Sequence, residues 1–147
     1  MHRRCFATAL VLLACAIAAP VAAQDAQLGY PAVPLLSTGT TILGQKIRYP
    51  AGDPHVDAAI VTLAPGQRAM LHKHDVPLFA YILEGELTVD YGSYGQRVYR
   101  KGDSLVEAMD VPHFSVNTGT TPMRLLGVYI GAVGVKDMTP VTEPGAK

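Results

Sequence analysis

Cysteine is nearly absent from this chain of 147 residues, and its two copies, Cys5 and Cys15, both fall within the first 23 residues. A protein that loses this segment would keep no cysteine at all. Disulfide bonds are therefore excluded as a source of stability for the rest of the chain. Its folded state has to be held together by packing, supplemented at most by a bound ion or a partner subunit.

Neither sign of charge dominates the sequence. The 12 Lys and Arg residues balance the 12 Asp and Glu residues, and charged residues make up only 16% of the chain. No basic cluster is longer than Arg100-Lys101. Binding to nucleic acid or to an anionic membrane would require a basic stripe or patch, so the sequence supports neither kind of partner.

Helical periodicity is also missing beyond a turn or two. Short β-type runs are separated instead by turn residues, such as Pro65-Gly66 and Glu84-Gly85. Strands of this length and spacing are typical of an all-β sandwich or barrel. The expected strands are Thr41–Arg48, Val56–Leu63, Ala69–His74, Phe79–Leu83, Glu86–Tyr91, Gln96–Arg100, Ser104–Glu107, His113–Asn117 and Arg124–Ile130.

Residues 1–23 have the features of a secretory signal peptide. Arg3 and Arg4 form a basic start, residues 6–19 are uncharged and apolar, and small residues precede a cleavage point after Ala23. The apolar core is shorter than the roughly 20 residues that a membrane span needs. We therefore expect a periplasmic or secreted protein without membrane association after signal cleavage. An uncleaved anchor and a lipoprotein modified at Cys15 are the alternatives.

The histidines form the most informative polar pattern. His72 and His74 are two residues apart on an expected strand, so their side chains point to the same face. His113 comes from a distant strand and would complete a metal site, because imidazole suits zinc, iron, copper or nickel. Histidines that merely alternate on a surface or in a core are the alternative. His55 lies in an expected turn and should be solvated.

Glycines and an asparagine surround these histidines at regular spacing: Gly66, His72, His74 and Gly85 in one stretch, and Gly102, His113 and Asn117 in another. The two stretches resemble the two motifs of the cupin family, and the strand pattern extends the resemblance to about residues 40–131. The resemblance implies a double-stranded β-helix, or jelly-roll barrel. It also implies that His72, His74 and His113 are ligands of a divalent metal ion.

The sequence departs from the cupin motifs in an informative way. Leu78 stands where the first motif has a glutamate, while Ala108 and Asp110 replace the proline and glycine of the second. Asp tolerates unusual turn dihedrals better than most residues. Without the glutamate, three neutral imidazoles would leave the charge of the metal uncompensated and coordination positions open. A vestigial site of weak affinity is the alternative.

Two carboxylates stand close to the expected ligands. Asp75 directly follows His74, so on a straight strand it should face away from the metal. Glu107 could supplement the three histidines. A carboxylate near a ligating imidazole is more often a hydrogen-bond acceptor for the second ring nitrogen, so we expect Glu107 to have that role or to be a rim charge. Tyr81, three residues after Leu78, should point to the opposite face.

The expected organisation has four parts: a signal peptide over residues 1–23, an extended N-terminal arm over 24–40, a cupin domain over 41–131 and a loose C-terminal tail over 132–147. The runs at residues 78–83 and 124–130 are apolar on both faces. Their outer face should be covered either by the partner in a homodimer or by the N-terminal arm of the same chain.

These features together predict an exported single-domain cupin that binds a divalent metal and a small-molecule ligand. The metal would be Fe, Zn, Mn, Ni or Cu, which the sequence does not distinguish. The open coordination positions favour a metal-dependent, dioxygenase-like enzyme acting on a small organic substrate. The scarcity of proton-transfer residues besides Glu107 and Tyr81 favours the alternative, a non-catalytic periplasmic protein that binds a small molecule or metal. The expected walls of the site are Met70, Leu71, Leu78, Phe79 and Phe114.

Overall fold

The computed structural model describes residues 31–142, so the expected signal peptide and the start of the arm lie outside the described residues. None of the helices in this range has the length and hydropathy for crossing a membrane. The described residues form strands β1 (Pro54–Leu63), β2 (His72–His74), β3 (Leu78–Glu84), β4 (Glu86–Asp90), β5 (Gln96–Arg100), β6 (Ser104–Val106), β7 (Phe114–Val116), β8 (Met123–Ala132) and β9 (Met138–Pro140), with a 3-10 turn at Gly92–Tyr94.

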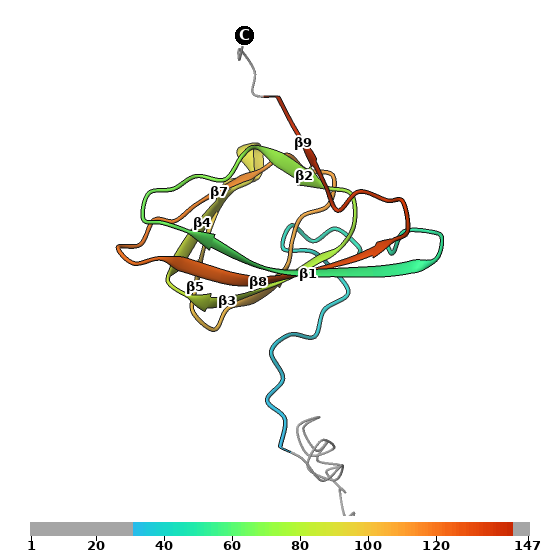
Figure 1. The fold of residues 1–147 in the computed structure, drawn as a ribbon, viewed down its shortest axis with the longest axis horizontal. Helices are drawn as coiled ribbons and strands as arrows, with labels where there is room; N and C mark the ends of the chain where they lie inside the picture. Colours follow the sequence, from blue (N-terminus) through green and yellow to red (C-terminus); the bar gives the residue numbers. More distant parts are fainter. Residues whose placement is uncertain (1–30, 143–147) are drawn as a thin grey trace, which may run out of the picture. The chain divides into compact units, whose positions relative to one another are not determined.

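The strands form three sheets around one core. A four-stranded sheet has the order β1-β8-β3-β6, a three-stranded sheet has the order β5-β4-β7, and β2 pairs with β9. Figure 1 shows β2, β7 and β9 at one side of the barrel and β1, β8 and β3 at the other. All six pairings between these strands are antiparallel, as expected for a jelly roll. The all-β jelly-roll barrel expected from the sequence is confirmed.

Alternation along β3 and β4 explains where the core lies. Ala80 and Ile82 on β3 are buried, and so are Leu87 and Val89 on β4. Each set is spaced by two residues, so it lies on one face of its strand. Burying a side chain such as Ile82 contributes about 1.5–3 kcal/mol, which makes this inward face the main source of stability in a chain without disulfides.

Three residues of the cupin motifs shape the loops. Gly85 has a φ of 75°, and a Cβ there would lie 2.8 Å from the carbonyl oxygen of Pro122, so both backbone conformation and space require glycine. Asp110, which replaces a motif glycine, has a φ of 59° and tolerates it as expected. Asn117 is fully buried, and its amide donates to the carbonyl of Leu63 (2.9 Å).

The segment before β1 differs from the expectation. No strand spans residues 41–48, where only a single bridge joins Thr40 and Lys46. The segment instead attaches to the edge of β6, where the N–H of Ile42 donates to the carbonyl of Val106 (2.8 Å) and Ser104 Oγ donates to the carbonyl of Leu35 (2.7 Å). The strand prediction was wrong because the backbone turns here, with the N–H of Gly44 donating to the carbonyl of Thr41 (2.9 Å), while Ile42 and Leu43 pack against the core.

This segment covers part of the outer face of the four-stranded sheet. Leu36, Ile47 and Tyr49 line a groove of about 240 Å³ together with Phe79 and Val106. The apolar outer face is therefore covered, at least in part, within the same chain. The homodimer remains a prediction.

The C-terminal residues are more ordered than the expected loose tail. β8 continues to Ala132, and β9 pairs with β2 so that Lys73 lies opposite Thr139. Thr139 Oγ1 also donates to Asp75 Oδ2 (2.5 Å). The loose-tail prediction was wrong for residues 132–140, because the short strand β2 finds its pairing partner there. Proline at position 140 is tolerated since it stands at the end of the strand.

Candidate metal centre

The structure brings together the three histidines that the sequence singled out. His72 and His74 lie on β2 with ring centroids 4.9 Å apart, which confirms that they share a face. His113 lies directly before β7, and its backbone exchanges two hydrogen bonds with that of His72 (3.0 and 2.8 Å). Its ring centroid is 4.6 Å from that of His72 and 5.1 Å from that of His74. One ligand atom from each histidine lies within 4.8 Å of the others.

Each imidazole is held by a backbone carbonyl at its Nδ1 atom. A carbonyl oxygen can only accept a hydrogen bond, so each Nδ1 carries the proton and each Nε2 keeps a free lone pair. Such a bond fixes both ring orientation and tautomer in metal-binding histidines. The three pairs are His72 with Met70 (2.8 Å), His74 with Asp137 (3.3 Å) and His113 with Val111 (2.8 Å).

Burial favours the neutral form of the imidazoles of His72 and His74. His74 and His113 are each only 2% exposed. Burial lowers the pKa of His74 to about 3, with the neighbouring His113 and His72 adding to the effect. Burial also lowers the pKa of His72. Neutral imidazole is the form that binds metal, so the residues present fit a divalent ion at neutral pH.

The two nearby carboxylates behave differently from each other. Asp75 faces away from the cluster, as expected, and pairs with Lys73 (3.4 Å). Glu107 has neither of its two expected roles. It is buried, and its Oε1 accepts hydrogen bonds from the hydroxyl of Tyr91 (2.5 Å) and the N–H of Ala108 (3.1 Å). The second ring nitrogens have backbone carbonyls as partners, so no imidazole needs Glu107 as an acceptor.

Three tyrosines near the cluster were missed in the sequence. The ring of Tyr91 lies 5.4 Å from that of His113, and the ring of Tyr129 lies 5.8 Å from that of His74. The hydroxyl of Tyr99 lies 3.3 Å from that of Tyr91. Burial raises the pKa of Tyr99 to about 12 and also raises those of Tyr91 and Tyr129. All three phenols are therefore neutral hydrogen-bond donors at neutral pH.

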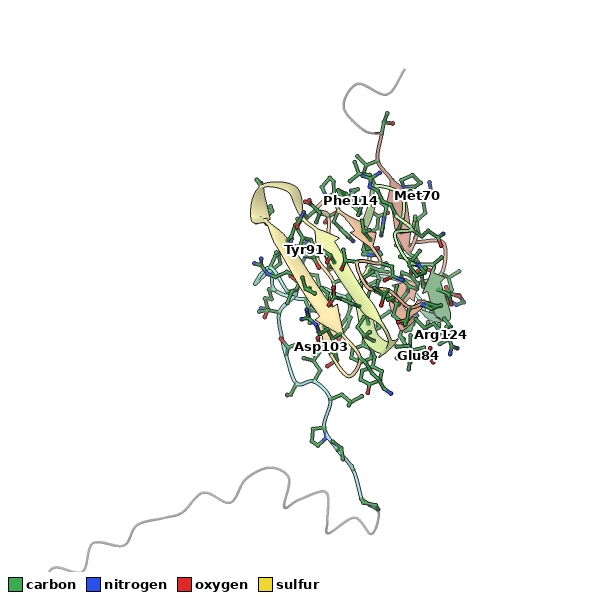
Figure 2. The ribbon with its side chains drawn as sticks, turned by 90° about the vertical axis from the view of Figure 1, so that its left-hand side faces the viewer. Met70, Glu84, Tyr91, Asp103, Phe114 and Arg124 are labelled. Atoms are coloured by element: carbon green, nitrogen blue, oxygen red, sulfur yellow. The ribbon has the colours of Figure 1, made fainter. Side chains whose placement is uncertain are left out.

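The expected walls are only partly correct. Leu78 is buried and begins the inward face of β3, whereas Phe79 points to the outer face and lines the groove described above. Tyr81 alternates with Leu78, as expected. Figure 2 places Met70 and Phe114 together at one end of the barrel. Met70 is 59% exposed, so it forms a rim and not a wall.

His55 was correctly expected to be solvated, although it lies in β1 and not in a turn. Its side chain is 55% exposed, and its Nε2 lies 3.2 Å from Asp57 Oδ2. A substitution of His55 therefore offers a matched control for substitutions of the three clustered histidines.

Comparison with known families supports the resemblance seen in the motifs. Residues 59–129 match the family model described as Cupin domain. Residues 59–129 are a cupin domain. The matched range contains all three clustered histidines, while the segment before β1 and strand β9 lie outside it. No curated protein matches the chain.

Several solved structures are similar to this cupin. An oxalate decarboxylase from Lactobacillus farciminis, in a formate complex, is 24% identical with a TM-score of 0.51 and aligns over 58% of this chain and 26% of its own. An oxalate oxidase in complex with glycolate is 26% identical with a TM-score of 0.50, and aligns over 58% of this chain and 46% of its own. The polyketide cyclase RemF from Streptomyces resistomycificus is 18% identical with a TM-score of 0.52, and aligns over 64% of this chain and 65% of its own. This cupin spans less than two thirds of each of these chains.

Proposed function

We propose that this cupin binds one divalent metal ion through His72, His74 and His113 and is a metal-dependent, dioxygenase-like enzyme acting on a small organic substrate. The observation that carries the proposal is the set of three imidazoles whose Nδ1 atoms are all held by carbonyls, which leaves three Nε2 lone pairs for one ion. A bound metal would supply Lewis acidity and, if it is redox-active, electron exchange with dioxygen.

The protein groups around the cluster would orient a substrate and exclude water. Burial of His74 and His113 removes one side of the site from solvent. The ring of Tyr129 lies 5.8 Å from that of His74. The ring of Tyr91 lies 5.4 Å from that of His113, and its hydroxyl shares a hydrogen bond with that of Tyr99. A few convergent polar groups in an otherwise apolar interior are characteristic of small-molecule sites.

A small carboxylate is the first substrate class to examine. The similar oxalate oxidase is described with the substrate analogue glycolate. A divalent ion at the proposed centre would keep a net positive charge, so it would attract a carboxylate. Small phenols and thiols are the next classes.

Oxygen consumption by metal-loaded protein tests this proposal. Protein loaded separately with Fe²⁺, Mn²⁺, Zn²⁺, Ni²⁺ and Cu²⁺ would be mixed with oxalate, glycolate, small phenols or small thiols. We expect oxygen uptake with at least one combination for the wild type and for His55→Ala, and none for His74→Ala. Binding of these compounds without any turnover would overturn the proposed enzymatic activity and would support the alternative, a non-catalytic binding protein.

We also propose that the protein is exported and cleaved after Ala23. The basic start, the uncharged apolar core and the small residues at positions 21–23 support this. Intact mass measurement on the exported protein should give a chain that begins at Gln24. A chain that begins at Met1, or a lipid on Cys15, would overturn the proposal.

A further inference from the structure

Glu107 lies directly across a strand pair from Leu78. β3 and β6 are antiparallel, with Phe79 opposite Val106, and the N–H of Glu107 donates to the carbonyl of Leu78 (2.8 Å), which extends the same register by one residue. Directly opposed residues on neighbouring strands point to the same side of the sheet. The carboxylate therefore lies on the inward face, beside the position where the cupin motif has its glutamate.

The hydrogen bonds of Glu107 keep one carboxylate oxygen available to a cation. Both donors, the hydroxyl of Tyr91 and the N–H of Ala108, bind Oε1 and not Oε2. Tyr91 also connects the carboxylate to the cluster, since its ring lies 5.4 Å from that of His113.

The Glu107 carboxylate and a divalent ion held by the three histidines are electrostatically complementary. An ionised carboxylate in an apolar interior is strongly disfavoured unless a cation or several donors compensate its charge. Three neutral imidazoles cannot compensate it, whereas a divalent ion held by those imidazoles can. The same ion would otherwise keep its full charge in a site where position 78 is a leucine.

We propose that Glu107 supplies the carboxylate of the metal centre, from the strand beside position 78, in place of the glutamate that the motif lacks. Tyr91 is then a positioning residue, because its hydroxyl holds Oε1 and leaves Oε2 without either of these two hydrogen bonds. This inference rests on the proposed three-histidine metal site. It gives the site four protein ligands, three neutral and one anionic.

Titration calorimetry with Mn²⁺ and Zn²⁺ tests the inference through metal selectivity. Carboxylates suit Mn²⁺, while imidazoles already satisfy Zn²⁺. Glu107→Gln keeps the shape and the acceptor for Tyr91 but removes the charge. We expect its affinity for Mn²⁺ to fall about 10- to 100-fold, the range seen when groups supporting a metal site are lost, and its affinity for Zn²⁺ to fall less. The control Glu84→Gln removes an exposed carboxylate that pairs with Arg124, and should change neither affinity.

A relocated carboxylate provides the decisive variant. Leu78→Glu combined with Glu107→Gln moves the charge to the motif position, and should restore most of the lost Mn²⁺ affinity. If Glu107→Gln does not fold, Glu107→Asp replaces it, because Asp keeps the buried charge but draws the carboxylate back by one methylene. We expect the Asp variant also to bind Mn²⁺ more weakly.

The possible failures are distinguishable. Wild-type affinities for both metals in Glu107→Gln, or in Glu107→Asp where that variant is used, would overturn the role of Glu107 and leave the three-histidine site intact. Wild-type protein that binds neither metal would overturn the proposed function itself.

Discussion

The two segments that flank the matched cupin region act on different parts of the barrel. Before β1, Leu36, Ile47 and Tyr49 line a groove with Phe79 on the outer face of the four-stranded sheet. Gln45 of the same segment exchanges hydrogen bonds with the backbone of Met109 (2.7 and 3.1 Å), but no described hydrogen bond joins the segment to the three clustered histidines. After β8, the carbonyl of Asp137 accepts the Nδ1 proton of His74, and β9 pairs with the strand that carries two of the histidines.

This difference shows that the candidate site is not confined to the motif residues. The N-terminal segment contributes buried apolar surface, so its loss should lower the stability of the fold. The C-terminal segment contributes an acceptor that sets one imidazole's tautomer, so its loss should lower metal affinity. The two effects can be separated by measuring unfolding and metal binding on the same variants.

The largest expected effect is on the N-terminal side. Phe79→Ala removes a ring that lines the groove together with the N-terminal segment, and should lower the free energy of unfolding by about 2–3 kcal/mol, somewhat less than for a fully buried phenylalanine. Metal affinity should stay within about twofold of wild type. Urea unfolding and calorimetry check the two halves of this prediction. A loss of metal affinity as large as the loss of stability would show that the two regions are coupled.

The dependence of stability on pH should come from the site and not from the N-terminal cover. His74 has a pKa of about 3 when folded, against about 6.5 when unfolded, so the unfolded state binds more protons between these values. The free energy of unfolding of metal-free protein should therefore fall as the pH falls below about 6.5, by roughly 2 kcal/mol at pH 5.

Two variants sharpen this second prediction. In His74→Ala the loss of stability between pH 7 and pH 5 should shrink, because the titrating group is gone. In Phe79→Ala the free energy of unfolding should be lower by the same amount at every pH. An unchanged pH dependence in His74→Ala would contradict the assignment.

The smallest expected change in free energy is a loss of metal affinity after deletion of the C-terminal segment. Deleting residues 135–147 removes β9 and the carbonyl that holds His74, and should weaken Zn²⁺ binding about tenfold, which corresponds to about 1.4 kcal/mol. The core between the two main sheets should remain folded, as judged by circular dichroism. Unchanged Zn²⁺ affinity would show that the C-terminal segment does not order the site.

Some of this arrangement could be predicted from local sequence and some could not. The period of two in a strand was sufficient to place His72 and His74 on one face. The same period could have placed Tyr91 on the inward face, since it continues the alternation of Leu87 and Val89. The inward direction of Glu107 also follows from Leu105, two residues earlier and buried.

Long-range pairing is what the sequence did not reveal. That Glu107 is opposite Leu78 depends on the register between β3 and β6, and that Asp137 holds His74 depends on pairing between segments 63 residues apart. The strand expected at residues 41–48 failed for a related reason. Its apolar residues satisfy a strand pattern, but Ile42 and Leu43 pack against the core from a turn, which the local pattern does not specify.

The metal content of the protein tests the central claim most directly. Wild type, His55→Ala and His74→Ala would be incubated with excess Zn²⁺, desalted and analysed for bound metal by mass spectrometry. The account predicts about one zinc per chain for the wild type and His55→Ala, and almost none for His74→Ala. Equal zinc in all three proteins, or none in the wild type, would contradict it.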